Sequence, residues 1–427
     1  MLESAMLFAV MLVCIALSIP IGITIGISTA LCLYFFSDMS LLMIAQKAAT
    51  GLDSFPLLAI PFFILAGSLM CEGGIAKRIV NLADTLVGFI TGGLSMVTVM
   101  ACMFYAAISG SGPATVSAIG SFMIPAMEER KYDAGFAGAV AACAGTIGVI
   151  IPPSIPFVIY CVVAQVSIGD MFIAGIIPGI ILGCALMFTC WIISKKKGYI
   201  SDTPRPTIKS VGRALRESFF ALMVPVIILG GIYGGIFTPT EAAVVAVVYS
   251  IIVGRFIYRE LDNKKLYACF KESVLVNGAL EFMIGLSMAF GAFLAMEQIP
   301  AVMAKWLISF SDSKFVILLV INILLLILGC FVDNIAAVII LTPILLPVVK
   351  SLGMDPIHFG LIITVNLAIG FVSPPYGINL FVASAVSGVS IERLSTALIP
   401  LFLAMVACLM LFTYVPIITM GLVYLIR

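Results

Sequence analysis

Charged residues are scarce in this chain, and their scarcity excludes an ordinary water-soluble fold. Aspartate, glutamate, lysine and arginine make up 10% of the 427 residues, whereas 63% are hydrophobic. Soluble domains carry about a quarter of their residues as charges, so the composition predicts a protein that resides in a phospholipid bilayer. The net charge is only +1 and no basic patch on a soluble segment is present, so nucleic acid is not an expected partner.

Histidine is nearly absent, and the cysteines lack metal-binding spacing. His358 is the single histidine, and none of the 11 cysteines forms a C-x-x-C pair. A transition-metal centre needs several such ligands at defined spacing, and a nucleophilic serine such as Ser111 needs an adjacent base. We therefore expect no enzyme, no transition-metal site and no organic cofactor, and we place His358 in a loop beside the Asp355-Pro356 turn.

The chain does contain an internal repeat at a constant offset of 222 residues. The register pairs Ser111 with Asp333, Pro125 with Pro347, Asp133 with Asp355, Gly138 with Gly360, Pro152-Pro153 with Pro374-Pro375, and Pro178 with Pro400. Chance rarely keeps glycine and proline in step over so long a stretch. Broken segments at matching places in two halves of an apolar chain are typical of secondary transporters.

The repeat organises one all-α polytopic membrane domain over residues 1–427. We expect repeat one at about 55–193 with its hairpin and broken helix at 87–166, a basic cytoplasmic link at 194–216, a scaffold helix pair at 217–258, and repeat two at about 275–425 with its hairpin and broken helix at 314–388. Segments 111–127, 154–166, 334–349 and 376–388 are too short to span a hydrocarbon core of roughly 30 Å, so they are predicted half-helices.

Three local features complete this outline. Residues 4–36 are predicted to be one retained membrane helix, because the acidic Glu3 stands where a signal peptide is basic. Residues 396–425 are predicted as one further span. Thr238, Pro239 and Glu241 have the spacing of a capping box, which predicts a helix start at Thr238.

Each copy contains two polar, helix-breaking segments that could carry chemistry. A proline pair removes two backbone donors and leaves nearby carbonyls without partners, which lipid tolerates only where a protein cavity is lined or something is bound. Freed carbonyls with hydroxyl and amide oxygens suit a sodium ion, and half-helix N-termini suit a carboxylate. A lone break is more often a packing kink, but breaks at one offset in both copies favour a site.

The residues of these segments divide into two predicted sets. The sodium-binding set is Ser109, Ser111, Gly112, Thr115, Gly145, Thr146, Gly148, Asp333, Asn334, Gly370 and Ser373. The substrate-binding set is Gly110, Pro113, Pro153, Ser154, Asn366, Pro375, Tyr376, Gly377 and Asn379. Asp333 is the only acidic residue near either hairpin tip, and an intramembrane carboxylate is functional by default.

Several runs resemble the large membrane subunit of a tripartite ATP-independent periplasmic (TRAP) transporter. They are Ala59–Phe63 (AIPFF), Ser109–Thr115 (SGSGPAT), Ile151–Ser154 (IPPS), Phe237–Ala243 (FTPTEAA) and Ser373–Gly377 (SPPYG). The resemblance covers essentially the whole chain. It implies hairpin tips at Ser109–Thr115 and Asp333–Ala336, and unwound helices at Gly145–Ser154 and Gly370–Asn379.

The resemblance also implies an architecture and partners. These are an inverted-repeat, ion-transporter-superfamily elevator fold with two re-entrant hairpins in a bacterial inner membrane, sodium coupling, a small four-helix membrane subunit and a periplasmic substrate-binding protein. The small subunit would be a separate polypeptide. The implied solute is an organic acid, C4-dicarboxylate or sialic acid, with a leaning toward the sialic-acid type.

Two other transport mechanisms remain open. A stand-alone sodium/carboxylate symporter of the same architecture would need neither partner, so uptake by the purified chain alone would favour it. An ion-conducting channel would show flux that neither saturates with solute nor requires an imposed sodium gradient.

Overall fold

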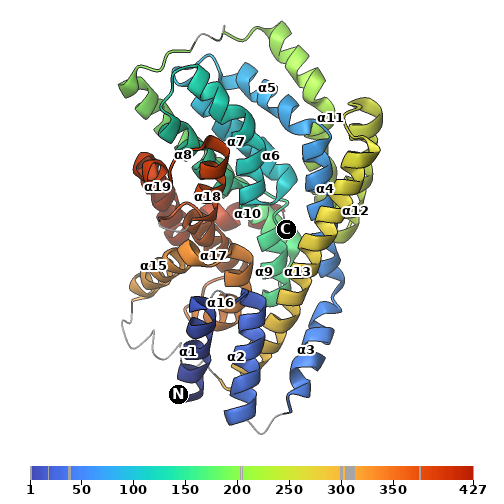
Figure 1. Cartoon of the computed structure of the whole chain (residues 1–427), viewed down its shortest axis with the longest axis vertical. Coiled ribbons are helices and arrows are strands. Elements are labelled where there is room, and N and C mark those ends of the chain that lie inside the picture. Colours follow the sequence, from blue (N-terminus) through green and yellow to red (C-terminus); the bar gives the residue numbers. More distant parts are fainter. Residues whose placement is uncertain are drawn as a thin grey trace.

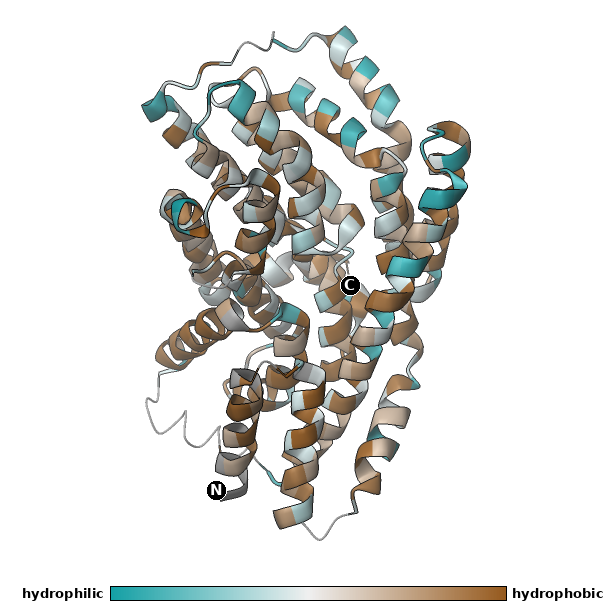
Figure 2. Ribbon diagram, viewed as in Figure 1, coloured by the Kyte–Doolittle hydropathy of each residue, from teal (hydrophilic) through white to brown (hydrophobic). Residues whose placement is uncertain are grey.

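The computed structural model describes residues 2–17, 19–36, 40–201, 203, 205–298, 302, 313–374 and 377–426. Every regular element within these ranges is a helix (Figure 1). Seven of the described helices are long and apolar enough to cross a membrane. Hydrophilic residues gather at one end of the molecule, around the 194–216 link and the turn that precedes α13 (Figure 2).

Proline splits the first and last predicted spans, which corrects both predictions. The first 36 residues form α1 (Leu2–Ala16) and α2 (Ile21–Phe36), with Pro20 directly before the second helix. The last span is α19 (Ile391–Tyr414) and α20 (Pro416–Ile426). In both places the proline lacks the backbone donor that a continuous helix requires, so the helix ends and a new one begins.

One group of helices packs along one edge of the molecule (Figure 1). It consists of α3 (Leu42–Leu52), η1 (Phe55–Leu58), α4 (Ala59–Glu72), α11 (Ile208–Tyr233), α12 (Pro239–Ile252), the π-helical η3 (Val253–Ile257) and α13 (Asn263–Met296). The predicted capping box at the start of α12 is confirmed, because Glu241 N–H donates to Thr238 Oγ1 and Thr238 N–H donates to Glu241 Oε2.

Apart from α1, α2, α19 and α20, the remaining helices are organised around two hairpins and two broken helices. The first hairpin is α6 (Gly93–Ser109) and α7 (Gly112–Glu129), and its broken helix is α8 (Ala134–Gly145) with η2 (Thr146–Val149), then α9 (Ile155–Ala164). The second hairpin is α15 (Lys314–Phe331) and α16 (Asn334–Ser351), and its broken helix is α17 (Pro356–Gly370), then α18 (Ile378–Ser387). Two further helices, α5 (Ile75–Val87) and α10 (Ile168–Lys197), complete this part.

The two copies interlock and run in opposite directions. The second half of each broken helix packs on the other copy: α18 contacts α7 and α8, and α9 contacts α16. After α7, the Asp133 N–H donates to Tyr199 Oη in the basic link, 3.0 Å away. After α16, the Pro356 carbonyl instead accepts from Tyr160 of α9, beyond the break. The start of α17 thus lies beside the second half of the broken helix of repeat one, whereas Asp133 lies at the start of its first half. The two copies are therefore inverted, as the predicted fold class requires.

His358 does not lie in a loop. Asp355 is the N-cap of α17 and Pro356 its first residue, so His358 belongs to the first turn of that helix. Its ring is buried, and Nε2 lies 2.9 Å from the Phe412 carbonyl oxygen. The prediction was wrong because an Asp-Pro pair starts a helix as readily as it forms a turn.

Asp133 and Arg393 form an ion pair whose contribution to stability depends on pH. Arg393 Nη2 lies 2.7 Å from Asp133 Oδ2, and this hydrogen bond lowers the pKa of the carboxyl. Because the folded pKa lies below the ordinary value of about 3.9, the stabilisation is present above about pH 4 and is lost as the pH falls through the folded pKa.

We expect Asp133→Asn to lower the melting temperature slightly at neutral pH. The pair is partly exposed, so its loss costs about 0.2–1 kcal/mol, while asparagine keeps the N-cap of α8. The difference from the unmodified chain, followed by thermal unfolding in detergent, should close below about pH 4. A gap that stays constant down to pH 3 would contradict this account, and Arg393→Gln should reproduce the effect at neutral pH.

Candidate ion and solute site

Both hairpin tips line one large cavity. The cavity has a volume of about 1030 Å³ and lies between α7, α4 and α13, with Ser109 and Ser111 contributed by the first tip and Asp333 by the second. The α7 wall presents small residues at helical spacing: Ser111, Ala114, Ser117, Ala118 and Ser121. Ser117 and Ser121 were not among the predicted residues, although they are four residues apart and therefore share one face of a helix.

Hydroxyl and carbonyl oxygens cluster at the first tip. Ser109 Oγ lies 2.8 Å from Thr115 Oγ1, which donates to the Ser111 carbonyl oxygen at 2.7 Å. Ser109 Oγ also lies 3.3 Å from that carbonyl oxygen. Three residues of the predicted sodium set are thus brought together, and two of them also face the cavity.

The broken helix of repeat one lies directly on this tip because glycines occupy the contact. A Cβ atom on Gly148 would lie 2.5 Å from Thr115 Oγ1 and 2.6 Å from the Ser111 carbonyl oxygen. A Cβ atom on Gly145 would lie 3.2 Å from the Gly112 carbonyl oxygen and would overlap Val116. Only glycine permits the main-chain oxygens of the tip to approach the backbone of the break this closely.

Asn379 of repeat two completes the surroundings of the first tip. Its Nδ2 donates to the Ala142 carbonyl oxygen in α8, at 3.1 Å. A carbonyl oxygen only accepts, so this bond fixes the orientation of the amide. The Oδ1 atom is buried without a partner and would lie 3.3 Å from a Cβ atom on Gly112.

The two polar residues of the second tip, Asp333 and Asn334, lie in different environments. Asp333 is the N-cap of α16, with Oδ2 accepting from the Ile335 N–H at 3.0 Å, and it lines the cavity. Asn334 instead approaches the Thr364 carbonyl oxygen of α17, 3.5 Å from Nδ2. Asn334 Oδ1 and Thr364 Oγ1 are buried without partners. The tip meets α17 where Gly329 packs against Gly370.

Other predicted residues lie in the breaks or within the first tip, and as far as the chain is described they are not part of the cavity lining. Thr146 Oγ1 donates to the Cys143 carbonyl, Ser154 Oγ to that of Val149, and Ser373 Oγ to that of Ile369. Gly110 contacts Pro153, Pro113 lies in the first turn of α7, and Gly377 is the N-cap of α18. Pro375 and Tyr376 fall outside the described residues.

Asn366, predicted to bind substrate, is fully buried on another side of α17. Its Nδ2 donates to Asn322 Oδ1 at 2.8 Å and to the Asn322 carbonyl oxygen at 3.0 Å. Asn322 Nδ2 in turn donates to Thr413 Oγ1 at 3.1 Å. This places Asn366 in a polar link between α15, α17 and α19.

The unpartnered oxygens suit an alkali cation. Asn334 Oδ1, Thr364 Oγ1 and Asn379 Oδ1 are neutral and buried without partners. Asn334 belongs to the second tip, the Thr364 main chain lies beside it, and Asn379 Oδ1 lies beside the first tip. Each would cost about 1–3 kcal/mol if it remained unsatisfied, and hard cations take oxygen ligands of this kind. Within the described ranges no cluster of three histidine, cysteine or acidic residues could hold a metal. The donor set therefore fits sodium in chemical type.

Inverted repeats with two hairpins and two broken helices around one membrane cavity define a secondary-transporter fold. The description "Tripartite ATP-independent periplasmic transporter, DctM component" applies to the family model that matches residues 8–418, so the chain belongs to this family. It is a multi-pass membrane protein, in bacteria of the inner membrane, and a transporter component, as the permease relatives are, not an enzyme.

The relatives of this chain are named for several different solutes. The chain is 48% identical to the isethionate TRAP transporter permease protein DctMQ of Oleidesulfovibrio alaskensis, over 97% of this chain and 65% of that protein. It is 41% identical to the C4-dicarboxylate large permease DctM of Pseudomonas aeruginosa and 38% to the sialic acid large permease SiaM of Vibrio cholerae, each over 93% of both chains.

A solved structure shares the fold. The YdaH transporter of Alcanivorax borkumensis, described as having an unusual topology, superposes with a TM-score of 0.60 over 87% of this chain and 86% of its own. The sequence identity is 13%, so the similarity shows the fold alone.

Proposed function

We propose that this chain is the large permease of a sodium-coupled system that imports a small organic anion. One observation carries the proposal: residues from both hairpin tips, Ser111 and Asp333, line the same cavity of about 1030 Å³. A single solute held there would contact both copies at once. Movement of the hairpin-bearing helices against the α4, α12 and α13 group, as in an elevator, would then change the side to which the cavity opens.

Sodium would be held beside the tips, within the protein. At the first tip the ligands would come from Ser111, Thr115, Gly145 and Asn379, and at the second from Asn334 and Thr364. The ion would supply positive charge close to the anionic solute. A bound sodium ion would thereby link each hairpin tip to the broken helix that the tip contacts. The remaining residues of the predicted sodium set would hold these ligands in position.

The solute would be recognised mainly by neutral donors. The N-terminus of α7 and the hydroxyls of Ser111, Ser117 and Ser121 face the cavity, and they suit an oxyanion. Lys77 and Lys265 bring positive charge to the same cavity, whose lining also includes the carboxylates of Glu72, Glu260, Glu272 and Asp333. A sulfonate such as isethionate and a carboxylate present similar oxyanions, so the relatives widen the predicted class from carboxylates to small organic anions.

Uptake into proteoliposomes tests the proposal. The chain would be reconstituted with a small membrane subunit and a periplasmic binding protein from the same organism, and isethionate, succinate and sialic acid would be compared. Saturable uptake of at least one anion that requires all three components is the expected result. Equal uptake by the chain alone would favour the stand-alone symporter.

The exposed face of α13 suits the small membrane subunit. Glu281 lies on this face among Leu275 and Phe282, and its carboxylate accepts from Asn277 Nδ2 at 2.8 Å. Asn277 Oδ1 has no partner, and no described lysine or arginine is paired with Glu281. Carboxylates in a membrane segment usually pair within the protein. A donor side chain on a partner helix would satisfy this pair.

Glu281→Leu should weaken co-purification of the small subunit about tenfold or more, since removing one partner of a desolvated polar contact costs about 1.5–3 kcal/mol. Leucine on this face is compatible with lipid, so the isolated chain should keep its melting temperature. Glu217→Gln, another exposed carboxylate change, should leave co-purification unchanged. Full recovery of the subunit with Glu281→Leu would exclude this surface.

A further inference from the structure

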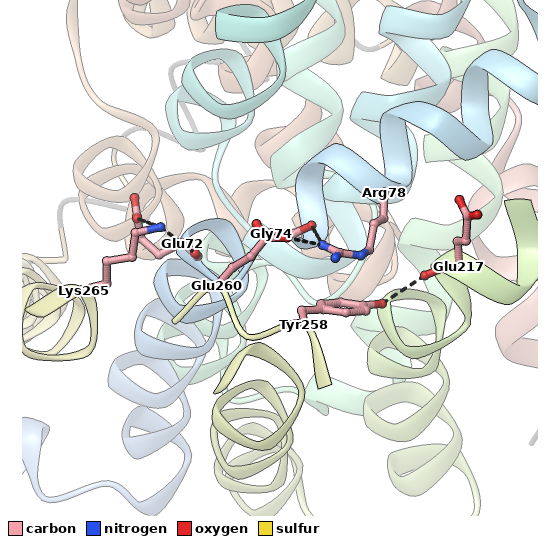
Figure 3. A network of polar contacts seen from close by, with 7 residues as sticks. All are labelled: Glu72, Gly74, Arg78, Glu217, Tyr258, Glu260 and Lys265. Carbon is pink, nitrogen blue, oxygen red and sulfur yellow. Dashed lines mark hydrogen bonds and ion pairs between the residues drawn. The ribbon is translucent and has the colours of Figure 1, made fainter. Parts of the chain in front are cut away.

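Helix α5 joins the α4 group to the first hairpin, and Arg78 in its first turn makes an unusual number of contacts. Arg78 Nη1 donates to the Gly74 carbonyl oxygen at 2.7 Å and lies 2.8 Å from Glu260 Oε1. The guanidinium carbon lies 3.6 Å from the centre of the Tyr258 ring, within the range of a cation–π contact (Figure 3). A planar guanidinium serves all three partners at once, which a lysine could not do.

These partners are the N-cap of α5 and residues of the helix group outside the hairpins. Tyr258 and Glu260 lie between η3 and α13, and Tyr258 Oη donates to the Glu217 carbonyl of α11 at 3.3 Å (Figure 3). Ser218 of α11 donates to the Arg78 carbonyl oxygen at 2.9 Å. Both the side chain and the main chain of Arg78 are therefore tied to this group.

The joint between α4 and α5 is tightly packed. Gly74 has φ +79°, and a Cβ atom there would collide with the Glu260 carboxylate. A Cβ atom on Gly73 would lie 3.2 Å from Gly254 Cα in η3. Glycine at these two positions allows the Glu260 carboxylate and the π-helical turn to pack directly against the backbone, so no space is left between α4, α5 and η3.

The opposite end of α5 has a different character. Gly88 and Gly92 lie between α5 and α6, Gly93 is the first residue of α6, and Gly92 has φ +75°. The Gly92 N–H donates to the Tyr199 carbonyl at 3.0 Å, and Ser201 donates to the Gly88 carbonyl. Residues 199–201 follow α10, so this end is tied to the chain that carries the broken helix.

We infer that Arg78 is a positioning residue that holds the first turn of α5 on the α4, α11 and α13 group throughout transport. The first hairpin then moves on the glycines at 88–93. The inference rests on the proposed function, because it presumes that the hairpins move. In this role Arg78 contacts neither solute nor ion. It acts by holding the N-terminal end of α5 in place, while the C-terminal end of α5 connects to the first hairpin.

Charge variants test the role in the reconstituted full system. Arg78→Gln should lower the maximal uptake rate about five- to tenfold, since it removes one charge-assisted pair and one cation–π contact, with the half-saturating solute concentration unchanged. Combining Arg78→Glu with Glu260→Arg should restore part of the rate, which a general loss of stability would not allow. Arg255 of the adjacent η3 donates to Asn263 Oδ1. Arg255→Gln, which removes this charge, should leave the maximal uptake rate unchanged.

A cross-link decides between a permanent anchor and a contact that opens. Cysteines would replace Arg78 and Glu260 in a cysteine-free chain, and a bis-methanethiosulfonate spacer would join them. Transport at the rate of the unlinked double variant is expected. Arrest by the spacer, or an unchanged rate for Arg78→Gln, would overturn the inference. Failure of the unmodified chain to transport any anion would instead contradict the proposed function.

Discussion

Gly148→Ala should reduce uptake about 10- to 100-fold, because overpacking a dense interior costs about 1–3 kcal/mol. The added methyl would lie 2.5 Å from Thr115 Oγ1 and 2.6 Å from the Ser111 carbonyl oxygen. The latter is a main-chain atom, so relief requires a shift of the hairpin tip. The break would then no longer meet the tip at the distance that a shared ion requires. Initial rates of uptake measure the effect.

Gly120→Ala is the matched control for this variant. Gly120 is also buried in the first hairpin, but a Cβ atom there would meet only side-chain atoms, the nearest 3.4 Å away on Ile124. We expect its uptake to stay within about twofold of the unmodified chain, since it makes only ordinary van der Waals contact. Normal uptake by Gly148→Ala would show that the tip does not need its contact with the break.

Asn379→Leu should raise the sodium concentration needed for half-maximal uptake about 10- to 100-fold. The estimate follows from the loss of one buried polar contact to a charged group, worth about 1.5–3 kcal/mol. Leucine has a similar volume, but it lacks both the bond to the Ala142 carbonyl and the unpartnered Oδ1 beside Gly112. Uptake measured as a function of sodium at saturating solute gives the value.

The same variant separates two roles for Asn379. The sequence assigned this residue to the solute, whereas its position beside the first tip favours the ion. A raised half-saturating solute concentration with unchanged sodium dependence would support the first role and contradict the second. Ser387→Ala on the same helix removes only local hydrogen bonds, to Ala383 and Val389, and should change neither value.

Much of the fold could be predicted because glycine and proline mark several of the places where membrane helices end, although prolines such as Pro178 and Pro400 lie inside helices. The segments 111–127 and 334–349 correspond in position to α7 and α16, and the capping box at Thr238 lies at the start of α12. With 18 residues, α16 is longer than predicted and is long and apolar enough to cross a membrane. The same rule, applied to Pro20 and Pro416, would have divided the first and last spans. Hydropathy alone does not show these helix ends, because the helices on both sides of each proline are apolar.

The site was less predictable because its residues come together across the copies. Asn379 follows the second break in sequence but contacts α8 of the first copy, and only the packing of α18 shows this. Asn366 lies in the same broken helix as Thr364, yet residues two apart on a helix face different sides. The Thr364 carbonyl lies beside Asn334 of the second tip, while the Asn366 side chain contacts Asn322.

The ion dependence of uptake tests the central claim most directly. Proteoliposomes that contain the chain and its two partners would receive an inward gradient of sodium or an equal gradient of potassium, at one membrane potential and one solute concentration. The account predicts accumulation of the anion with the sodium gradient and none with potassium. Equal accumulation under both gradients would show that the neutral oxygens at the two tips do not couple sodium to transport.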